Sequence, residues 1–412
     1  MATPSLAMIP SGYKAGKVYS VLPESGVGDF DFTRATTATR INSSGLIEEM
    51  GINVPRLEYP LIDGVVNGCP SLLLEPQRTN LITYSEAFDN AYWTKSGASV
   101  VSGFTSPDGS LNAFKLVEDT SNSQHYISTS SIVSTTGITT QTLYVKSDGV
   151  RYVRLFDIFV GGSDFDLQNG IVTNNSGIVS SSIKDAGNGF YRIQISVNSS
   201  GNSYFRFYLC DSVGNTSYQG DGTSGVYIFG AQLEEGSYPT SYIPTNGASV
   251  TRNSETANGA GDATTFNDSE GVLMAEISFP KTTVGSGNKR IAISDGTSAN
   301  RIMFTEVGNT GISALITSGG VNSAYVVGDV NNLLFVKSAI KYKQNDFALW
   351  VNGFELAIDT SGNAPSGLSE LAFDGGDGTN PFFGKTKQIQ YYNTVLTDSE
   401  LEQLTSWTSF TD

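Results

Sequence analysis

The chain has 412 residues, and at roughly 150 residues per domain its length predicts two or three domains. Its 24 Lys and Arg against 40 Asp and Glu give a net charge of −16, which argues against nucleic-acid binding and against attraction to anionic membranes. The single histidine, His125, argues against histidine-dependent catalysis and multi-histidine metal sites.

Other features of the whole chain indicate a folded protein without membrane insertion. The aromatic content of 11% argues against wholesale disorder. No stretch approaches the roughly 18 apolar residues of a membrane span. No charged leader precedes an apolar run at the N-terminus, so we expect no secretory signal. Cys69 and Cys210 do not make a disulfide framework, and we expect both to be buried thiols.

Residues 1–80 hold short strands, such as 30–33 and 71–75, among many prolines and glycines. Their apolar periodicity is too weak for a large core, and such a segment gains stability by packing on a neighbour. The run FTRATTATR places Arg34 and Arg40 on an otherwise neutral ribbon. We therefore predict an attachment region that docks onto another protein or onto sister subunits.

Residues 81–250 form a strand-rich unit. The segments 190–197 (FYRIQISV) and 204–209 (YFRFYL) alternate residue by residue, which is typical of strands with one buried and one solvated face. Turn clusters, such as GDGTSG at 220–225, lie between the strands. Further strands are predicted at 142–146, 151–160 and 226–230.

Residues 251–271 are polar and rich in Gly, Ala and Thr, which predicts a linker or long loop. Residues 272–412 form a second strand-rich unit. Its predicted strands are 272–279, 290–294, 301–305, 312–316, 334–342 and 347–351.

Two local signals mark the end of the chain. Asn352-Gly353 predicts a two-residue hairpin, because both positions tolerate positive φ. In LTDSELEQLTSW, Thr397 and Glu400 have the spacing of a capping box and predict one short helix. The whole pattern predicts an all-β, multi-domain protein with two antiparallel β-sandwiches after an irregular N-terminal region.

Alternation also predicts which side chains of the middle unit face solvent. A sugar stacks on aromatic rings and pairs its hydroxyls with polar groups. If the strands are neighbours, we expect a glycan-binding patch; an ordinary solvated face, or one covered by another subunit, is the alternative. In the last unit, Trp350 is either a core residue or a second stacking platform, and Trp93 is read as a packing anchor. The candidate residues of the middle unit are Tyr152, Arg154, Arg192, Gln194, Tyr204, Arg206 and Tyr208.

Catalytic and metal signals are weak. Glycoside hydrolysis uses two carboxylates that flank the bond, whereas Glu276 and Glu306 are lone acids, expected on solvated strand faces. His125 has no nucleophile-elbow signal near it, so we expect no enzyme. Asp374 and Asp377 lie in a glycine-rich segment whose oxygens could hold Ca²⁺; a glycine-rich turn with solvated acids is the alternative. No cofactor is expected to be required.

Three stretches carry a resemblance: 30–59, the run LLLEPQRTNL within 68–95, and GAQLEEGSYPTSYIPT within 226–252. Together they resemble a module of structural proteins of tailed bacteriophages, especially tail fibres and other virion surface appendages. In such proteins the part that matches 81–250 is similar to carbohydrate-binding modules with a jelly-roll sandwich. Residues 272–412 resemble concanavalin A-like (laminin G-like) sandwiches through FALWVNGFELAID and FFGKTKQIQYYNTVLTDSELEQL.

The resemblance implies a protein exposed on the virion, such as a tail fibre or head fibre, that binds host-surface or environmental glycans. It implies attachment to other virion proteins through 1–80, assembly in the host cytoplasm, and a homo-oligomer, with a trimer as the candidate. The first alternative is a capsid or tail decoration protein that makes only protein–protein contacts. A glycan-degrading enzyme and a bacterial adhesin are further alternatives.

Overall fold

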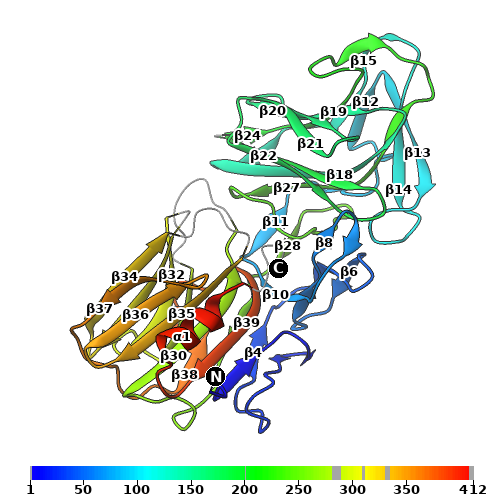
Figure 1. Ribbon diagram of the computed structural model, residues 1–412. Helices are drawn as coiled ribbons and strands as arrows, with labels where there is room; N and C mark the ends of the chain where they lie inside the picture. Colours follow the sequence, from blue (N-terminus) through cyan, green and yellow to red (C-terminus); the bar gives the residue numbers. More distant parts are fainter. Residues whose placement is uncertain (1, 200, 281–288, 309–310, 330–334, 408–412) are drawn as a thin grey trace.

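The computed structural model describes residues 2–199, 201–280, 289–308, 311–329 and 335–407. Among the described residues every regular element except one short helix is a β-strand, which confirms the all-β prediction. Two β-sandwiches lie at opposite ends of the molecule, and the first 80 residues run beside one sandwich and between the two (Figure 1).

The middle sandwich consists of two six-stranded antiparallel sheets, which we call the outer and the inner sheet. The outer sheet runs in the order β12 (Trp93–Ser96), β16 (Tyr126–Thr129), β25 (Phe205–Cys210), β19 (Tyr152–Asp157), β20 (Gly161–Asp166) and β21 (Ile171–Ser176). The inner sheet runs β13 (Ala98–Phe104), β14 (Ala113–Glu118), β27 (Gly225–Glu235), β18 (Ile138–Asp148), β23 (Tyr191–Asn198) and β22 (Ser180–Asp185). The middle sandwich also has two separate two-stranded sheets: β15 (Asn122–Gln124) with β26 (Ser217–Gln219), and β17 (Val133–Thr135) with β24 (Gly201–Ser203).

The predicted alternation of the middle strands is confirmed for the apolar face, whereas Phe190, Gln194 and Ser196, expected on a solvated face, are buried as well. Ile193, Ile195 and Phe207 are fully buried between the two sheets, where burial of apolar surface drives folding. Trp93 is 2% exposed and packs on Phe205, so it is the packing anchor that the sequence predicted.

The C-terminal sandwich has an eight-stranded sheet and a five-stranded sheet. The larger sheet contains β37 (Phe354–Asp359), β36 (Asp346–Val351), β35 (Val336–Lys343), β30 (Glu270–Ser278), β39 (Gly384–Tyr392), β10 (Ser71–Leu74) and β7 (Arg56–Glu58), with β1 (Leu6–Met8) also paired to β39. The smaller sheet contains β34 (Val321–Asp329), β33 (Gly311–Ser318), β32 (Arg301–Val307), β31 (Arg290–Ser294) and β38 (Glu370–Ala372).

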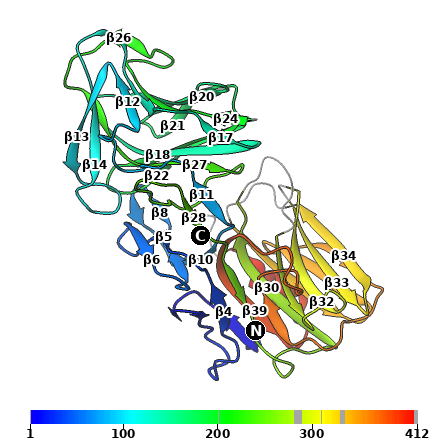
Figure 2. The same cartoon turned by 180° about the vertical axis from the view of Figure 1, so that it is seen from behind.

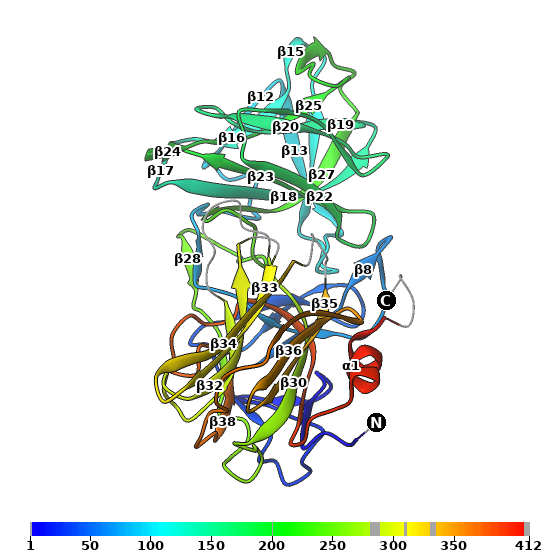
Figure 3. The same ribbon diagram turned by 60° about the vertical axis from the view of Figure 1, so that its left-hand side comes forward.

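Both local signals at the end of the chain are confirmed. Asn352 and Gly353 have positive φ angles of 50° and 88° and turn β36 into β37. Helix α1 (Asp398–Thr405) follows Thr397, whose side chain and that of Glu400 form the capping box. Figure 3 shows α1 lying against the larger C-terminal sheet.

The first 80 residues do not fold as a unit of their own. Their strands β1, β7 and β10 belong to the larger C-terminal sheet, and β4 (Phe30–Thr33) pairs with β29 (Thr256–Asn258). The neighbour on which this region packs is therefore the chain's own C-terminal sandwich. Docking of 1–80 onto another protein stays a prediction. The remaining short strands of the region are β2 (Tyr13–Lys14), β3 (Lys17–Val18), β5 (Ala38–Ile41), β6 (Ile47–Met50), β8 (Leu61–Ile62) and β9 (Val65–Val66).

The segment 251–271, expected as a linker, is also tied into the fold. It holds β29 and the end of β28 (Val250–Arg252), and β28 pairs with β11 (Arg78–Asn80). Composition alone suggests a loop, because the pairing partners lie more than 170 residues away in the sequence and leave no local signal.

A buried cluster of charges lies where the two sandwiches and the first region meet. Arg34, Arg56 and Arg252 are each about 1% exposed or less. Arg34 Nη1 lies 2.7 Å from Glu255 Oε1, while Arg56 Nη2 and Arg252 Nη1 lie 2.9 and 2.8 Å from Glu75 Oε2. Arg56 also pairs with Glu255. We call these five residues the ion network.

Two of the sequence strings that carry the resemblance supply residues to the ion network or hydrogen-bond to it. Glu75 belongs to LLLEPQRTNL, and Ser241 of the TSYIPT string donates from its backbone N–H and its hydroxyl to the two Glu75 oxygens, at 2.8 and 2.7 Å. Burial alone would raise the pKa of Glu75, but Arg252 and Arg56 outweigh it and hold the pKa below its ordinary value. The residues of these two strings therefore contact one another in the ion network, where the two sandwiches and the first region meet.

Candidate functional site

The outer sheet turns one face away from the rest of the chain, as the opposite views of Figures 1 and 2 show. The inner sheet is the one that packs on the first region. Tyr144, Phe190 and Phe229 of the inner-sheet side form a buried cluster with Ile47 of β6. Within the described part of the middle sandwich, the inner sheet is thus covered by the first region, and the outer sheet lies on the far side from it.

Neighbouring strands β19 and β25 bring four predicted site residues to the outward side of the outer sheet, where Tyr208 is 6% exposed and the other three are half-buried. Their register pairs Arg154 with Tyr208 and Phe156 with Arg206. Because side chains alternate along a strand, these residues and Tyr152 point to the same side of the sheet. The alternate residues of both strands lie in the core.

Arg206 is the centre of the face. Its guanidinium carbon lies 4.4 Å from the ring centroid of Tyr126, 5.5 Å from that of Tyr204 and 5.7 Å from that of Tyr208. Its Nη1 donates a hydrogen bond of 3.0 Å to the Tyr208 hydroxyl. Cation–π attraction at these distances fixes the guanidinium among the three rings. We call these four residues the tyrosine–arginine face.

Arg206 differs from the other arginines of the outer sheet. Arg154 donates two hydrogen bonds to Asp164, at 2.6 and 2.9 Å, and Arg151 pairs with Asp166 in the same way. No carboxylate pairs with Arg206 in the part of the chain that the structure describes, and its Nε is buried without a hydrogen-bond partner. The Arg206 side chain is half-buried and has no carboxylate partner, so an anionic group of a bound molecule could pair with its guanidinium.

Sequence reasoning missed Tyr126, although it supplies the ring nearest to Arg206. Tyr126 lies on β16, directly opposite Tyr208 on β25. Its strand is only four residues long, too short for alternation to be recognised. The pairing of β16 with β25 spans about 80 residues of sequence, so nothing local predicts it.

Arg192 and Gln194 were expected on the same patch, and this was wrong. Both lie on β23, which belongs to the inner sheet. Arg192 lies over the ring of Tyr144, and Gln194 is 5% exposed among serine hydroxyls. Alternation predicts which side of a strand faces outward but not which sheet the strand joins.

Trp350 is a core residue, not a stacking platform. It is 6% exposed and packs under α1 with Leu401 and Leu404. The alternative that Trp350 is an exposed stacking platform is therefore wrong, because α1 covers the outward face of β36.

Asp374 and Asp377, the two aspartates of the glycine-rich segment, stabilise turns through hydrogen bonds. Asp374 is 4% exposed and accepts hydrogen bonds from Gly376 N and Asn258 Nδ2, and burial raises its pKa. Asp377 accepts from the backbone and hydroxyl of Thr379. No group of three or more His, Cys, Asp or Glu able to hold a metal occurs among the described residues.

Three further expectations are corrected. Glu276 and Glu306 are each 5% exposed rather than solvated; Glu276 accepts from Gln388 at 2.8 Å, and Glu306 pairs with Lys289 at 3.0 Å. Cys69 is exposed, whereas Cys210 is buried as predicted. Burial raises the pKa of Cys210 to about 12.

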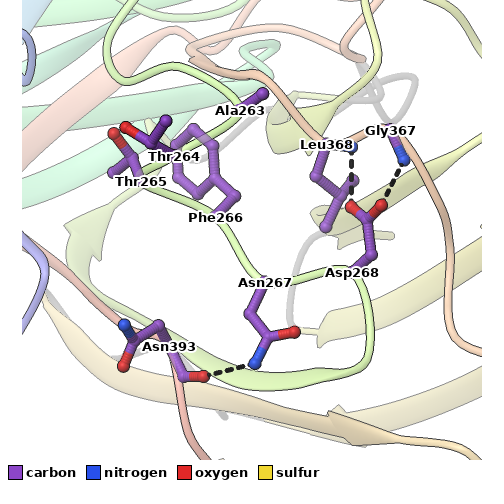
Figure 4. Close-up of a pocket in the computed structure, with 9 residues that line it drawn as sticks. All are labelled: Ala263, Thr264, Thr265, Phe266, Asn267, Asp268, Gly367, Leu368 and Asn393. Atoms are coloured by element: carbon purple, nitrogen blue, oxygen red, sulfur yellow. Dashed lines mark hydrogen bonds between the residues drawn. The ribbon is translucent and has the colours of Figure 1, made fainter.

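A shallow hollow of about 380 Å³ lies on the C-terminal sandwich (Figure 4). Its carboxylate, Asp268, accepts backbone hydrogen bonds from Gly367 and Leu368, at 2.7 and 3.0 Å. The amide of Asn267 donates to the backbone of Asn393. Because Asp268 and the Asn267 amide already hydrogen-bond within the chain, they offer few free donors or acceptors to a ligand in the hollow.

Comparisons with known proteins add a likeness in fold. No protein-family model and no curated protein matches the sequence. A carbohydrate-binding module of a Ruminococcus gnavus sialidase, solved with sialyllactose, is 18% identical, with 36% of this chain and 88% of that chain covered and a TM-score of 0.29. No helix in the described ranges is long and apolar enough to cross a membrane.

Two wider matches cover more of the chain. A proposed carbohydrate-binding protein of Bacteroides ovatus is 14% identical over 70% of this chain and 80% of that chain, with a TM-score of 0.27. The LG4-5 domains of the mouse laminin α1 chain are 9% identical over 82% and 91%, with a TM-score of 0.23.

Proposed function

We propose that the protein binds glycans through the tyrosine–arginine face and displays this face on the surface of a bacteriophage particle. The observation that carries the first part is Arg206, set among three tyrosine rings on the outer sheet with no carboxylate partner among the described residues. Aromatic rings offer stacking surfaces to a sugar, and the guanidinium offers donors to its oxygens. Glycans with a carboxylate are expected to bind best, because Arg206 has no protein carboxylate as a partner.

The virion part of the proposal rests on the sequence resemblance. The strings LLLEPQRTNL and GAQLEEGSYPTSYIPT resemble those of phage tail fibres and other appendages. Attachment to other virion proteins, assembly in the host cytoplasm and a trimeric state belong to this part of the proposal.

A glycan array on the full chain tests the first part, with neutral and carboxylated glycans side by side. We expect binding by the wild type and its loss in Tyr204→Ala/Tyr208→Ala. Absence of binding to every glycan, host polysaccharides included, would contradict the proposal.

A second candidate is a decoration protein that serves protein–protein contacts only. It is favoured by apolar side chains on two free sheet edges, β37 with Phe354 and Ile358 at 70% and 60% exposure, and β34 with Val321 at 68%. Exposed apolar patches of this kind mark interaction surfaces. A concentration-dependent oligomer that dissociates on Phe354→Glu, together with a silent glycan array, would favour this candidate.

A further inference from the structure

The C-terminal sandwich has two outer faces, and α1 covers one of them. Beneath the helix, Trp350 packs with Leu401 and Leu404 in an apolar cluster. The other outer face belongs to the smaller, five-stranded sheet. Its edge strand β34 lies on the side of the sandwich away from the first region (Figures 1 and 2). This second outer face carries polar and charged side chains that the proposed function does not use.

Six outward residues of the smaller sheet form a surface that we call the small-sheet face. Apolar residues at alternate positions of β31, β32, β33 and β34 lie in the core, so the residues between them point outward. The register sets Arg290 of β31 opposite Thr305 of β32. It sets Met303, Leu315 and Tyr325 side by side on β32, β33 and β34. The face consists of Arg290, Arg301, Met303, Thr305, Leu315 and Tyr325.

Two arginines of this face share one carboxylate. Arg301 Nη1 lies 3.7 Å from Asp377 Oδ2 and donates a hydrogen bond of 2.7 Å to the carbonyl oxygen of Gly375. Arg290 lies against the same turn, since a Cβ at Gly375 would lie 3.4 Å from its Cδ, and it has no ion pair in the described part of the chain. Burial and the positive charge of Arg290 lower the pKa of Arg301, whereas Asp377 raises it. Two guanidinium groups near one carboxylate leave a positive charge that an anion can neutralise.

Thr305 adds a buried hydroxyl to the same part of the face. The residue is 8% exposed, and its Oγ1 has no hydrogen-bond partner among the residues that the structure describes. A buried hydroxyl without a hydrogen bond is costly, so an oxygen of a bound molecule would stabilise this group. Arg290 lies directly opposite on β31, and a negatively charged oxygen that accepts from the hydroxyl therefore also faces a guanidinium.

The other end of the small-sheet face offers an aromatic ring to solvent. Tyr325, on edge strand β34, is 54% exposed, whereas Tyr208 of the tyrosine–arginine face is 6% exposed. An exposed aromatic ring is a stacking surface for a sugar ring. Three strand spacings, about 14 Å, separate β31 from β34. The face thus combines an excess positive charge with a stacking ring over a length that suits a short oligosaccharide.

We propose that the small-sheet face is a second ligand site, which takes an acidic saccharide. Its carboxylate or sulfate group lies at Arg290, Arg301 and Thr305, and one of its sugar rings lies on Tyr325. Charge complementarity favours an anionic ligand, because the chain carries a net charge of −16 and a local excess of positive charge is specific to this place. The site lies on the other sandwich from the tyrosine–arginine face and does not depend on the function proposed for that face.

Met303 can report binding at this face. It is 1% exposed and is one of five methionines, so Met303→Leu assigns its signal in a carbon-13 methyl spectrum of the full chain. The probes are an oligogalacturonate as the carboxylated saccharide, a heparin oligosaccharide as the sulfated one and a maltooligosaccharide as the neutral one. We expect the Met303 signal to shift with at least one acidic probe and not with the neutral probe. A signal that shifts with neither acidic probe, or equally with the neutral one, would overturn the proposal.

Calorimetric titration with the acidic probe that shifts Met303 tests the individual residues. Arg301→Gln should lower the affinity at least about tenfold, the effect of a lost charge-assisted hydrogen bond. Tyr325→Ala should lower it about tenfold through the lost stacking ring, and its exposed position keeps the test available if Arg301→Gln does not fold. Lys343→Gln removes a half-exposed cation from the larger sheet and is the matched control, expected to leave the affinity unchanged. Affinity equal to that of the wild type in both Arg301→Gln and Tyr325→Ala would overturn the proposal.

Arg206→Gln separates this site from the tyrosine–arginine face. We expect the Met303 shift to persist in this variant, because Arg206 lies on the other sandwich. Loss of the Met303 shift in Arg206→Gln would overturn the second site. If every array-positive glycan keeps its affinity in Arg206→Gln while the Met303 signal still shifts, the site proposed on the outer sheet fails and the small-sheet site stands.

Discussion

Arginine has two different environments in this molecule, and the difference shows what each region is for. In the ion network, buried guanidinium groups meet carboxylates supplied by distant parts of the same chain. On the tyrosine–arginine face, Arg206 meets aromatic rings and keeps an unpartnered Nε. In the first arrangement each guanidinium has a carboxylate partner within the chain; in the second no carboxylate of the described residues pairs with Arg206, and a ligand can supply one.

Removing one carboxylate of the ion network gives the largest expected effect. Glu255→Gln leaves Arg34 buried without its charge partner and Arg56 with Glu75 alone, and we expect a loss of about 3–5 kcal/mol in unfolding free energy. Denaturant unfolding followed by tryptophan fluorescence measures it. Glu48→Gln breaks a partly exposed pair with Arg40 and is the matched control, expected to change stability by about 1 kcal/mol or less. Equal effects of the two variants would contradict the role of the network.

Lowering the pH should give the next largest loss of unfolding free energy. The pKa of Glu75 is lower in the folded protein than its ordinary value, so its ion pairs stabilise the fold above the ordinary carboxyl pKa. This stability is lost as the pH falls below about 4, and we expect Glu75 alone to contribute about 2 kcal/mol to the loss. Unfolding free energies at several pH values between 7 and 2 measure the slope. The slope should be shallower in Glu75→Gln; an unchanged slope would contradict the assignment.

On the tyrosine–arginine face, Tyr126→Ala should weaken ligand binding. This is the smallest of the effects predicted here. The substitution removes the ring nearest to Arg206 but leaves the hydrogen bond from Arg206 to Tyr208. One lost cation–π contact predicts a loss of affinity of about 1 kcal/mol, or roughly fivefold, in a calorimetric titration with an array-positive glycan. Affinity equal to that of the wild type would show that Tyr126 is not part of the site.

Much of the fold could be predicted because alternation is local. The strands at 190–197 and 204–209, the Asn352-Gly353 hairpin and the capped helix all carry their signal within a few residues. Strands with few apolar residues could not be predicted; β20, for example, places only Phe165 in the core. In β20 (Gly161–Asp166), aspartates and glycines hide the strand, because Asp164 and Asp166 are buried only by pairing with arginines of a neighbouring segment.

The candidate site could be predicted only in part, because it depends on which strands pair. Arg154, Arg206 and Tyr208 meet as expected, since they lie on strands that are hydrogen-bonded neighbours. Arg192 has the same local pattern and lies on the other sheet. Arg34 illustrates the same limit in the first region: it looks like an exposed contact residue in sequence and is buried in the ion network.

The most direct test compares two arginines that both lie over tyrosine rings, Arg206 on the outer sheet and Arg192 on the inner sheet. Calorimetric titration of an array-positive, carboxylated glycan should be run on the wild type, Arg206→Gln and Arg192→Gln. We predict at least about a tenfold loss of affinity in Arg206→Gln and none in Arg192→Gln, with melting temperatures within a few degrees of the wild type. Equal affinity of the wild type and Arg206→Gln would contradict the assignment of the tyrosine–arginine face as the binding site.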